Sequence, residues 1–333
     1  MRELAQLGWS DPVVPIGSRL ETVGVTNEAG RAVAFRVVHG AALTPAGVPQ
    51  LAARLLPGAG ETVPVVVSRY LSPRLQQVLA SAGLSYADLV GNVRFVSRDP
   101  AISIRTVGGK SDPWRGPGRR RETLRGAPAA RVVRALCDLR PPFSVPELMQ
   151  AAEASAGATY RVIDFVVEQS YVERDPGGRI SRVDWRPLLE RWAADEPQLS
   201  AERSYPFLAP RGDLDAVLAM LADPSLPRSC VTGSFALRGL TSVAPARLLV
   251  AYTDEPLLVA ERLSLMPVDA GANVVLARPF DASVFQRDRV FGAVRFVAAS
   301  QLAADLLSSP GRGPNEGEAL LDWMEAHEDA WRS

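Results

Sequence analysis

The chain has 333 residues, of which 47% are apolar and 22% are charged, so its composition excludes fibrous and intrinsically disordered proteins. Its 37 basic and 37 acidic residues cancel, which excludes a wholly basic, histone-like binder. The two cysteines, Cys137 and Cys230, and the two histidines lie far apart, which excludes a cysteine–histidine zinc module and suits a reducing compartment. With no signal-peptide pattern and no apolar run of ~18 residues, we expect a cytoplasmic protein without membrane, metal or cofactor.

The charges are spread unevenly along the chain. Residues 1–111 carry four more basic than acidic residues, residues 115–182 also carry four more, and residues 212–333 carry six more acidic residues. A basic front half and an acidic back third predict one part that faces a polyanion and one part that does not.

Residues 1–111 predict an N-terminal α/β domain. Short apolar runs bounded by Gly and Pro predict strands over 31–38, 62–68, 92–97 and 101–105. Between them, Ser72 as N-cap, Pro73 as first helical residue and Gly83 as stop signal predict a helix. A metal-dependent nuclease would need a strand with an acid-x-lysine pattern, which this domain lacks. Asp88 is the one carboxylate that we single out here: it either belongs to an unusual catalytic site or caps the turn before the strand that begins at Asn92.

Residues 112–126 form a linker rich in Gly, Pro and Arg. It is either a solvated tether or a basic arm that lies along a phosphate backbone, and the arm would use Arg115, Arg119, Arg120, Arg121 and Arg125. Just before it, Gly108-Gly-Lys-Ser111 has the ending of a phosphate-binding loop. The match fails because Ile104 stands in the place of the first glycine and Pro113 in the place of a helix.

Residues 127–192 predict a winged helix-turn-helix. Apolar spacing predicts a first helix over 129–139, and the Ser144 and Glu147 pair, spaced as a capping box, begins a second helix. A turn over 154–157 precedes a third helix that starts near Thr159, and two short strands over 171–174 and 179–183 form a hairpin before a closing helix over 184–192.

This layout predicts which residues contact duplex DNA. The early residues of the third helix, Thr159, Tyr160 and Arg161, with Asp164 one turn later, would enter the major groove. The hairpin carries three arginines that would reach the backbone or the minor groove, namely Arg174, Arg179 and Arg182. The alternative is that these polar faces contact only solvent, or a protein.

After a second linker over 193–211, residues 212–333 predict an acidic C-terminal α/β domain. Its strand 230–232 runs into Gly233-Ser234, the turn with which nucleotidyltransferases begin their active site. Those enzymes hold magnesium with two carboxylates one residue apart on the next strand. Here the next strand ends in adjacent Asp254 and Glu255, so we expect a tight turn and a degenerate domain.

Several segments together resemble AbiEi-type antitoxins and transcriptional regulators, and a group of actinobacterial helix-turn-helix proteins of unclear role. They are Tyr70-Leu-Ser-Pro-Arg74, residues 82–92, the predicted winged helix, Val231-Thr-Gly-Ser-Phe-Ala236, residues 301–307 and Pro310-Gly-Arg312. The resemblance implies a DNA-binding repressor, antitoxin-like, with a nucleotidyltransferase-like toxin as partner. The N-terminal part is similar to a degenerate restriction-endonuclease-like fold. In AbiEi antitoxins the winged helix is N-terminal, whereas about 125 residues precede it here.

The sequence thus predicts a non-enzymatic α+β multidomain regulator that binds specific double-stranded DNA. Its acidic C-terminal domain would bind a partner protein, a second copy or a small ligand. Two alternatives stay open: a nuclease or nucleotidyltransferase with an atypical site, and a protein-interaction module that uses the winged helix as a docking surface.

Overall fold

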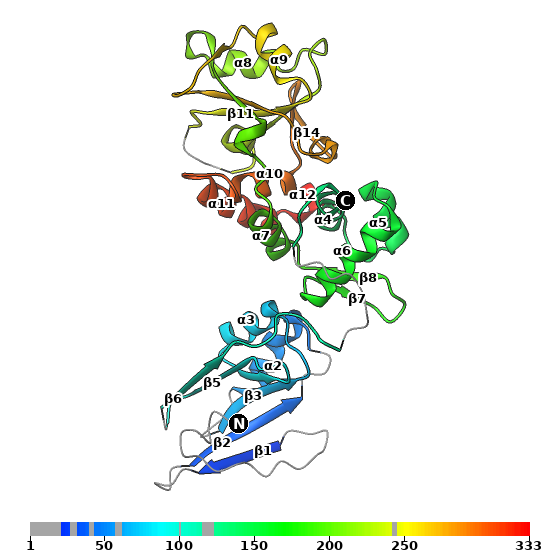
Figure 1. Ribbon diagram of the computed structural model, residues 1–333, viewed down its shortest axis with the longest axis vertical. Coiled ribbons are helices and arrows are strands. Elements are labelled where there is room, and N and C mark those ends of the chain that lie inside the picture. The colour runs from blue at the N-terminus through cyan, green and yellow to red at the C-terminus, as the bar shows by residue number, and fades with distance from the viewer. Residues whose placement is uncertain are drawn as a thin grey trace. The chain divides into compact units, whose positions relative to one another are not determined.

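The computed structural model describes residues 21–26, 32–39, 43–56, 62–99, 101–114, 123–241 and 245–333. It confirms a mixed α+β class with several sheets (Figure 1). The chain divides into two compact units. The first comprises Met1–Arg119 with Val166–Glu173, and the second comprises Arg120–Phe165 with Arg174–Ser333.

The first unit is built on a six-stranded sheet whose strands follow chain order. Its central strands β2, β3 and β4 are parallel, and antiparallel hairpins form both edges. The strands are β1 (Glu21–Thr26), β2 (Ala32–His39), β3 (Thr62–Ser68), β4 (Ser85–Asp88), β5 (Val93–Ser97) and β6 (Ile102–Thr106), and the helices are η1 (Pro45–Gly47), α2 (Val48–Leu55) and α3 (Pro73–Ser81).

Both faces of this sheet are apolar, because side chains alternate along each strand. Phe35 and Phe95 lie in one buried cluster, at 5.5 Å between ring centroids. Val66, on the opposite face of β3 from Val65, packs with Leu75 and the other apolar residues of α2 and α3. The predicted cap of α3 is confirmed, since Ser72 Oγ accepts a hydrogen bond from the Leu75 amide at 3.1 Å.

The central segment has the predicted order of three helices, a hairpin and a closing helix. The elements are α4 (Ala127–Asp138), α5 (Val145–Ala152), α6 (Ala156–Glu168), β7 (Val172–Arg174), β8 (Ile180–Val183) and α7 (Trp185–Asp195). The capping box of α5 is formed: Glu147 N donates to Ser144 Oγ, and Ser144 N donates to the Glu147 carboxylate.

The C-terminal part is built on a seven-stranded mixed sheet in the order β12-β9-β13-β11-β10-β15-β14. Its strands are β9 (Ser204–Leu208), β10 (Ser229–Thr232), β11 (Leu249–Thr253), β12 (Met266–Pro267), β13 (Val274–Ala277), β14 (Arg289–Phe291) and β15 (Val294–Phe296). Its helices are η2 (Ala201–Arg203), η3 (Pro210–Gly212), α8 (Leu214–Met220), η4 (Gly233–Leu237), α9 (Pro256–Arg262), η5 (Ala282–Phe285), α10 (Ala299–Leu307), α11 (Gly313–Ala326) and α12 (Glu328–Trp331).

The linker predicted over 193–211 is wrong. Its residues 204–208 form β9, which pairs antiparallel with β12 and β13 inside the C-terminal sheet. Pro206 misled the prediction, because a proline discourages a helix but is tolerated at positions of a strand that need no ladder donor. Residues 127–165 and 174–195 belong to the same unit as the C-terminal sheet, and in this unit α10 packs against α4 and α7 (Figure 1), whereas Val166–Glu173 belongs to the first unit.

A fully buried arginine on α4 joins these two parts. Arg134 is 0% exposed and donates to Ser300 Oγ at 3.0 Å and to Gln301 Oε1 at 3.0 Å on α10. It also donates to the carbonyl oxygens of Ser283 and Gln286, at 2.9 and 2.8 Å. A buried charge needs such complete pairing, so this contact requires the central segment and the C-terminal part to hold one relative position.

Candidate functional site

The first candidate site is the exposed face of α6. The helix begins at Ala156, three residues earlier than predicted, because Ser155 caps it: Ser155 Oγ accepts from the Ala158 amide at 3.4 Å. The turn that joins it to α5 is therefore only Glu153–Ser155, with Glu153 in the left-handed conformation at φ 49°. Gly157, expected in the turn, lies in the first turn of the helix.

Thr159 does not belong to this face, and its prediction as a DNA contact is wrong. The residue is 0% exposed, and its hydroxyl donates to the Ser155 carbonyl oxygen at 3.0 Å. A start at Ala156 places Thr159 on the inner side of the helix together with Val162 and Ile163, which are also 0% exposed. Its hydroxyl is satisfied within the helix and cannot reach a base.

Tyr160, Arg161 and Asp164 are exposed on the opposite side, as predicted for a contact face. Tyr160 is 47% exposed although it is aromatic, so the fold does not use it as core. The Arg161 guanidinium extends toward the N-terminus of α6, because a Cβ atom placed on Gly157 would lie 3.5 Å from Arg161 Nη1. Arg161 makes no hydrogen bond or ion pair to any described residue, and it is therefore a charge still available to a partner.

The three hairpin arginines differ in how far the fold already uses them. Arg179 donates to the Pro142 carbonyl oxygen at 3.1 Å and lies 3.6 Å from the Glu147 carboxylate. Arg182 pairs with Asp184 at 3.2 Å. Arg174 is exposed and has no partner among the residues described. Of the three, Arg174 is thus the side chain most available for a phosphate.

The central segment is not basic in itself. Residues 127–192 contain nine arginines and nine carboxylates, so the positive excess predicted for this region comes from the linker before it. The predicted contacts Arg115, Arg119, Arg120 and Arg121 lie outside the residues that the structure describes. Arg125 is described, and it donates to the Asp195 carbonyl oxygen at 2.6 Å, so the fold already uses it. Any long-range attraction of this region to a polyanion must therefore come from the linker.

Two residues of the first unit have structural roles: Asp88, the candidate for a nuclease site, and Gly108, the candidate for a phosphate-binding loop. Asp88 accepts hydrogen bonds from the amides of Leu71, Val90 and Asn92 at 2.9 to 3.1 Å, so it caps the turn before β5. Gly108 is needed for close approach, because a Cβ atom there would lie 2.1 Å from the Val90 carbonyl oxygen. Its amide donates to Asn92 Oδ1 at 2.8 Å and is therefore used within the fold.

The Gly233-Ser234 turn lacks the carboxylates of a metal clamp. The antiparallel register of β10 and β11 pairs Thr232 with Val250, so the residues opposite the turn belong to the start of β11, where Leu248 and Arg247 stand. Asp254 lies at the other end of β11 and pairs with Arg228 at 3.3 Å. No group of three metal-ligating residues exists in the described part of the chain. The turn continues into the short 3₁₀ helix η4.

A buried carboxylate lies beneath this turn. Asp305 on α10 is 0% exposed and accepts hydrogen bonds from Thr232 Oγ1, from Tyr252 Oη at 3.0 Å and from Gln301 Nε2 at 2.8 Å. Burial raises the pKa of Asp305 to about 6 despite these donors. Because Gln301 also bonds Arg134, a continuous polar chain connects the strand β10 with α4.

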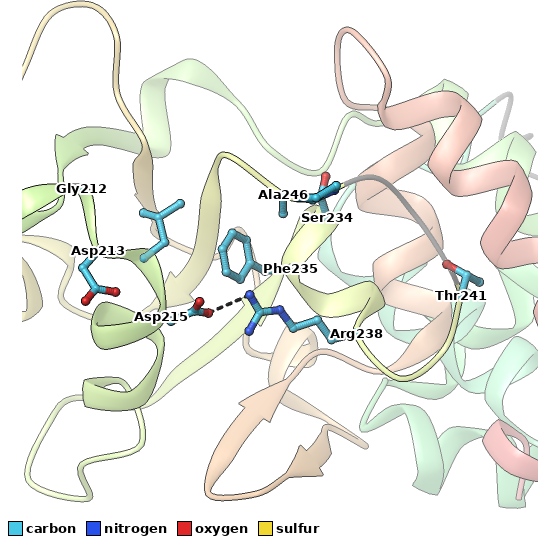
Figure 2. Close-up of a pocket in the computed structure, with 10 residues that line it drawn as sticks. Gly212, Asp213, Asp215, Ser234, Phe235, Arg238, Thr241 and Ala246 are labelled. Carbon is cyan, nitrogen blue, oxygen red and sulfur yellow. Dashed lines mark hydrogen bonds and ion pairs between the residues drawn. The ribbon is translucent and has the colours of Figure 1, made fainter.

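The second candidate site is a pocket beside the Gly233-Ser234 turn (Figure 2). Its volume is about 520 Å³, and its lining combines the start of α8 with η4 and the loop after it. An ion pair joins two of its walls, with Arg238 Nη2 at 2.7 Å from Asp215 Oδ1. The lining residues are Gly212, Asp213, Leu214, Asp215, Ser234, Phe235, Arg238, Thr241, Pro245 and Ala246.

No family model, no curated protein and no solved structure matches the chain. Among the described residues, no helix has both the length and the apolarity to cross a membrane. The function of the chain is therefore inferred from the geometry of its two candidate sites.

Sequence reasoning missed both the pocket and the buried network. Asp213 and Asp215 are separated by one residue, but this spacing occurs by chance in any acidic segment. Arg134 lies at an apolar position of α4, between Val133 and Ala135, and an arginine in the middle of a buried stripe was the available signal.

Proposed function

We propose that the chain is a double-stranded DNA-binding regulator in which α4 to β8 form a winged helix and α6 enters the major groove. The observation that carries this proposal is Arg161, exposed and without a partner in the described structure, on the outer face of the third helix of a three-helix and hairpin segment. The resemblance to AbiEi-type regulators supports the same function, and it includes segments outside the predicted winged helix.

The chemistry of the exposed face suits a base edge. An arginine in the first turns of such a helix can pair with O6 and N7 of a guanine. Gly157 and Ala156 leave the start of α6 without bulky side chains, so the helix can approach the floor of the groove. Tyr160 can contact a phosphate or a thymine methyl group, and Arg174 a phosphate of the flanking backbone. Thr159 has no part in this proposal.

The charge balance predicts how the affinity for DNA is divided between the winged helix and the linker that precedes it. With the winged helix neutral overall, non-specific affinity would come mainly from the arginines of residues 115–125. We propose that this segment supplies phosphate contacts while α6 supplies the sequence preference. The C-terminal domain would be non-enzymatic, since the start of β11 lacks carboxylates, and would provide regulation.

The experiment sequences the genomic DNA that the purified chain retains at near-physiological salt, then measures affinity for the enriched site and for random duplex. Arg161→Ala should cost about 1–3 kcal/mol on the enriched site and little on random DNA. Arg174→Ala should weaken both and reduce the salt slope by about one. Arg262→Ala is the matched control, because Arg262 is an exposed arginine on α9, in the C-terminal part.

Two results would contradict the proposal. Retained DNA without an enriched sequence would favour a docking module for proteins. Equal losses on both duplexes for Arg161→Ala would remove the base-reading role from this residue.

A further inference from the structure

We propose that the outer face of the β5–β6 hairpin in the first unit binds the phosphate backbone of duplex DNA. The two strands form one edge of the six-stranded sheet (Figure 1). Because side chains alternate along a strand, Phe95 and Ile104 face the buried cluster on one side, and their neighbours face the other side. We call this outer side the hairpin face, and its residues are Arg94, Val96, Ser103 and Arg105, with Arg98 and Val107 directly after the strands.

The rest of the first unit leaves the hairpin face open. On the same side of the sheet, Tyr86 of β4 packs with the apolar residues of α2 and α3, so these helices cover the sheet as far as β4. Beyond β4 the side chains are exposed, including Ser103 and Arg105 of β6. Val96 and Val107 are 41% and 75% exposed. The hairpin face is therefore an accessible surface of the unit.

The charges of this face all have the same sign. Arg94 and Arg105 stand directly opposite each other on β5 and β6, and like charges in such a pair are destabilising. Neither guanidinium forms an ion pair with a described residue: Arg94 donates to the Leu84 carbonyl oxygen at 3.1 Å, and Arg105 makes no hydrogen bond in the described part of the chain. Residues 92–110 contain four basic residues and one acidic residue. An anion bound between the two guanidinium groups would relieve their repulsion.

A hydroxyl donor lies in the same row of the sheet. The strand register places Tyr86 beside Arg94, so Tyr86, Arg94 and Arg105 form one row across three strands. Burial raises the pKa of Tyr86, and the charges of Arg105 and Arg94 oppose this rise, so both guanidinium groups lie near its hydroxyl. Tyr86 Oη donates to Gln76 Oε1 at 3.5 Å, a long hydrogen bond. The row thus presents N–H donors together with an O–H group, and phosphate oxygens are the acceptors that match it.

The side chains of the hairpin face favour duplex DNA over other anionic partners. The planar fork of a guanidinium matches the oxygens of a phosphate. Binding of a single strand uses exposed aromatic side chains on which bases stack, and docking of a protein centres on aromatic anchors. The apolar side chains of the hairpin face are two valines, and Tyr86 is only 5% exposed. Arginines without a stacking surface suit the outer backbone of a duplex.

This surface goes beyond the proposed function. That function assigns the sequence preference to α6 and phosphate contacts to residues 115–125, whereas the hairpin face belongs to the first unit. Phosphate contacts carry no base information, so the hairpin face would increase the affinity for every duplex sequence alike. It would do so even if α6 read no sequence.

The test measures fluorescence anisotropy of a labelled random-sequence duplex with the full chain, from about 50 to about 200 mM salt. Each phosphate contact that is lost reduces the salt slope of the affinity by about 0.9. The double variant Arg94→Gln and Arg105→Gln should therefore reduce the slope by about two and weaken binding at least about tenfold. The double variant Arg94→Lys and Arg105→Lys keeps both charges and should keep most of the slope.

A single pair of variants provides the matched control. Arg54 is an exposed arginine of α2 in the same unit and has no ion pair among the described residues, so Arg54→Gln changes the net charge as much as Arg105→Gln does. Arg105→Gln should reduce the slope by about one, and Arg54→Gln should leave it unchanged. Because Arg105 makes no hydrogen bond in the described structure, this variant tests the face even if substitution of Arg94 prevents folding.

Thermal unfolding verifies that each variant is folded before binding is compared. An unchanged slope for Arg105→Gln, an equal loss for Arg54→Gln, or no duplex binding at low salt would overturn the hairpin face as a DNA-binding surface. Stronger binding of single-stranded DNA, polyglutamate or phosphatidylserine vesicles that is lost in Arg105→Gln would overturn it in favour of that partner. Retained genomic DNA without an enriched sequence would overturn the proposed function alone, and the slope change in Arg105→Gln would still support the hairpin face.

Discussion

The buried Arg134 gives the sharpest test of how the central segment is held on the C-terminal part. We consider Arg134→Met, which keeps most of the side-chain volume but removes the charge and its donors. In the structure, this change takes donors from the carbonyl oxygens of Ser283 and Gln286 and from Gln301 Oε1. It also removes a fully buried cation whose Nη2 lies 3.5 Å from the carboxylate of Asp138, which is itself 2% exposed.

The expected loss in the free energy of unfolding depends on the Asp138 charge that stays buried after the substitution. Breaking a buried pair by removing one partner costs about 3–5 kcal/mol, because the remaining charge is uncompensated. Asp138 keeps a contact with Arg287 at 3.3 Å and a hydrogen bond from Ser300, so we expect about 3 kcal/mol, the lower end of that range. Replacing Asp138 by Leu in the same chain removes the stranded charge, and the double variant should regain part of the loss.

The assay is urea unfolding followed by tryptophan fluorescence. Trp185 and Trp192 are buried in α7, which packs on α10, and they report the loss of this contact. A cost below about 1 kcal/mol for Arg134→Met would refute the view that this arginine joins the two parts. The view would also be refuted if adding Asp138→Leu to Arg134→Met lowered the stability by as much as Asp138→Leu does alone. That result would mean that the two side chains act independently.

Two further predictions concern the pH dependence of stability and a close approach in the first unit. The pKa of Asp305 is about 6 in the folded chain and about 4 when unfolded, so the folded state binds more protons between these values. Stability from this group is therefore lost as pH rises from about 4 to 6, by about 3 kcal/mol. Asp305→Asn should flatten that dependence in urea titrations, and an unchanged slope would contradict the assignment. Gly108→Ala should destabilise the first unit by about 3 kcal/mol, because its Cβ would meet backbone atoms. Gly47→Ala, whose Cβ has only ordinary contacts at 3.5 Å, is the control, and equal Tm values for the two would refute the argument.

Local signals were sufficient for the elements whose ends depend on neighbouring residues. The Ser72 cap of α3 and the Ser144–Glu147 box of α5 act within three residues, so the sequence predicts them directly. The same holds for the order of three helices and a hairpin, because each apolar stripe has the period of its own element. The exposed positions of Tyr160 and Arg161 follow from that period.

Elements whose identity depends on distant contacts could not be predicted in this way. β9 contains a proline and few local strand signals, and it is a strand because β12 and β13 offer it partners more than 50 residues away. Thr159 was expected as a contact at the start of the helix, but α6 begins at Ala156, so Thr159 lies inside it. It precedes Val162 and Ile163 by three and four residues and is buried with them on one face of the helix.

By itself, then, the sequence determined the mixed α and β class of the chain, the central helices and hairpin, and the exposed positions of Tyr160, Arg161 and Asp164. Only the tertiary structure decided that α4 and α7 share one unit with the C-terminal sheet, that Arg134 and Asp305 belong to one buried network, and that Asp213, Ser234 and Arg238 line one pocket. The physical reason is range: caps and periodicity act over a few residues, while a buried charge or a cavity is defined by groups that only folding brings together.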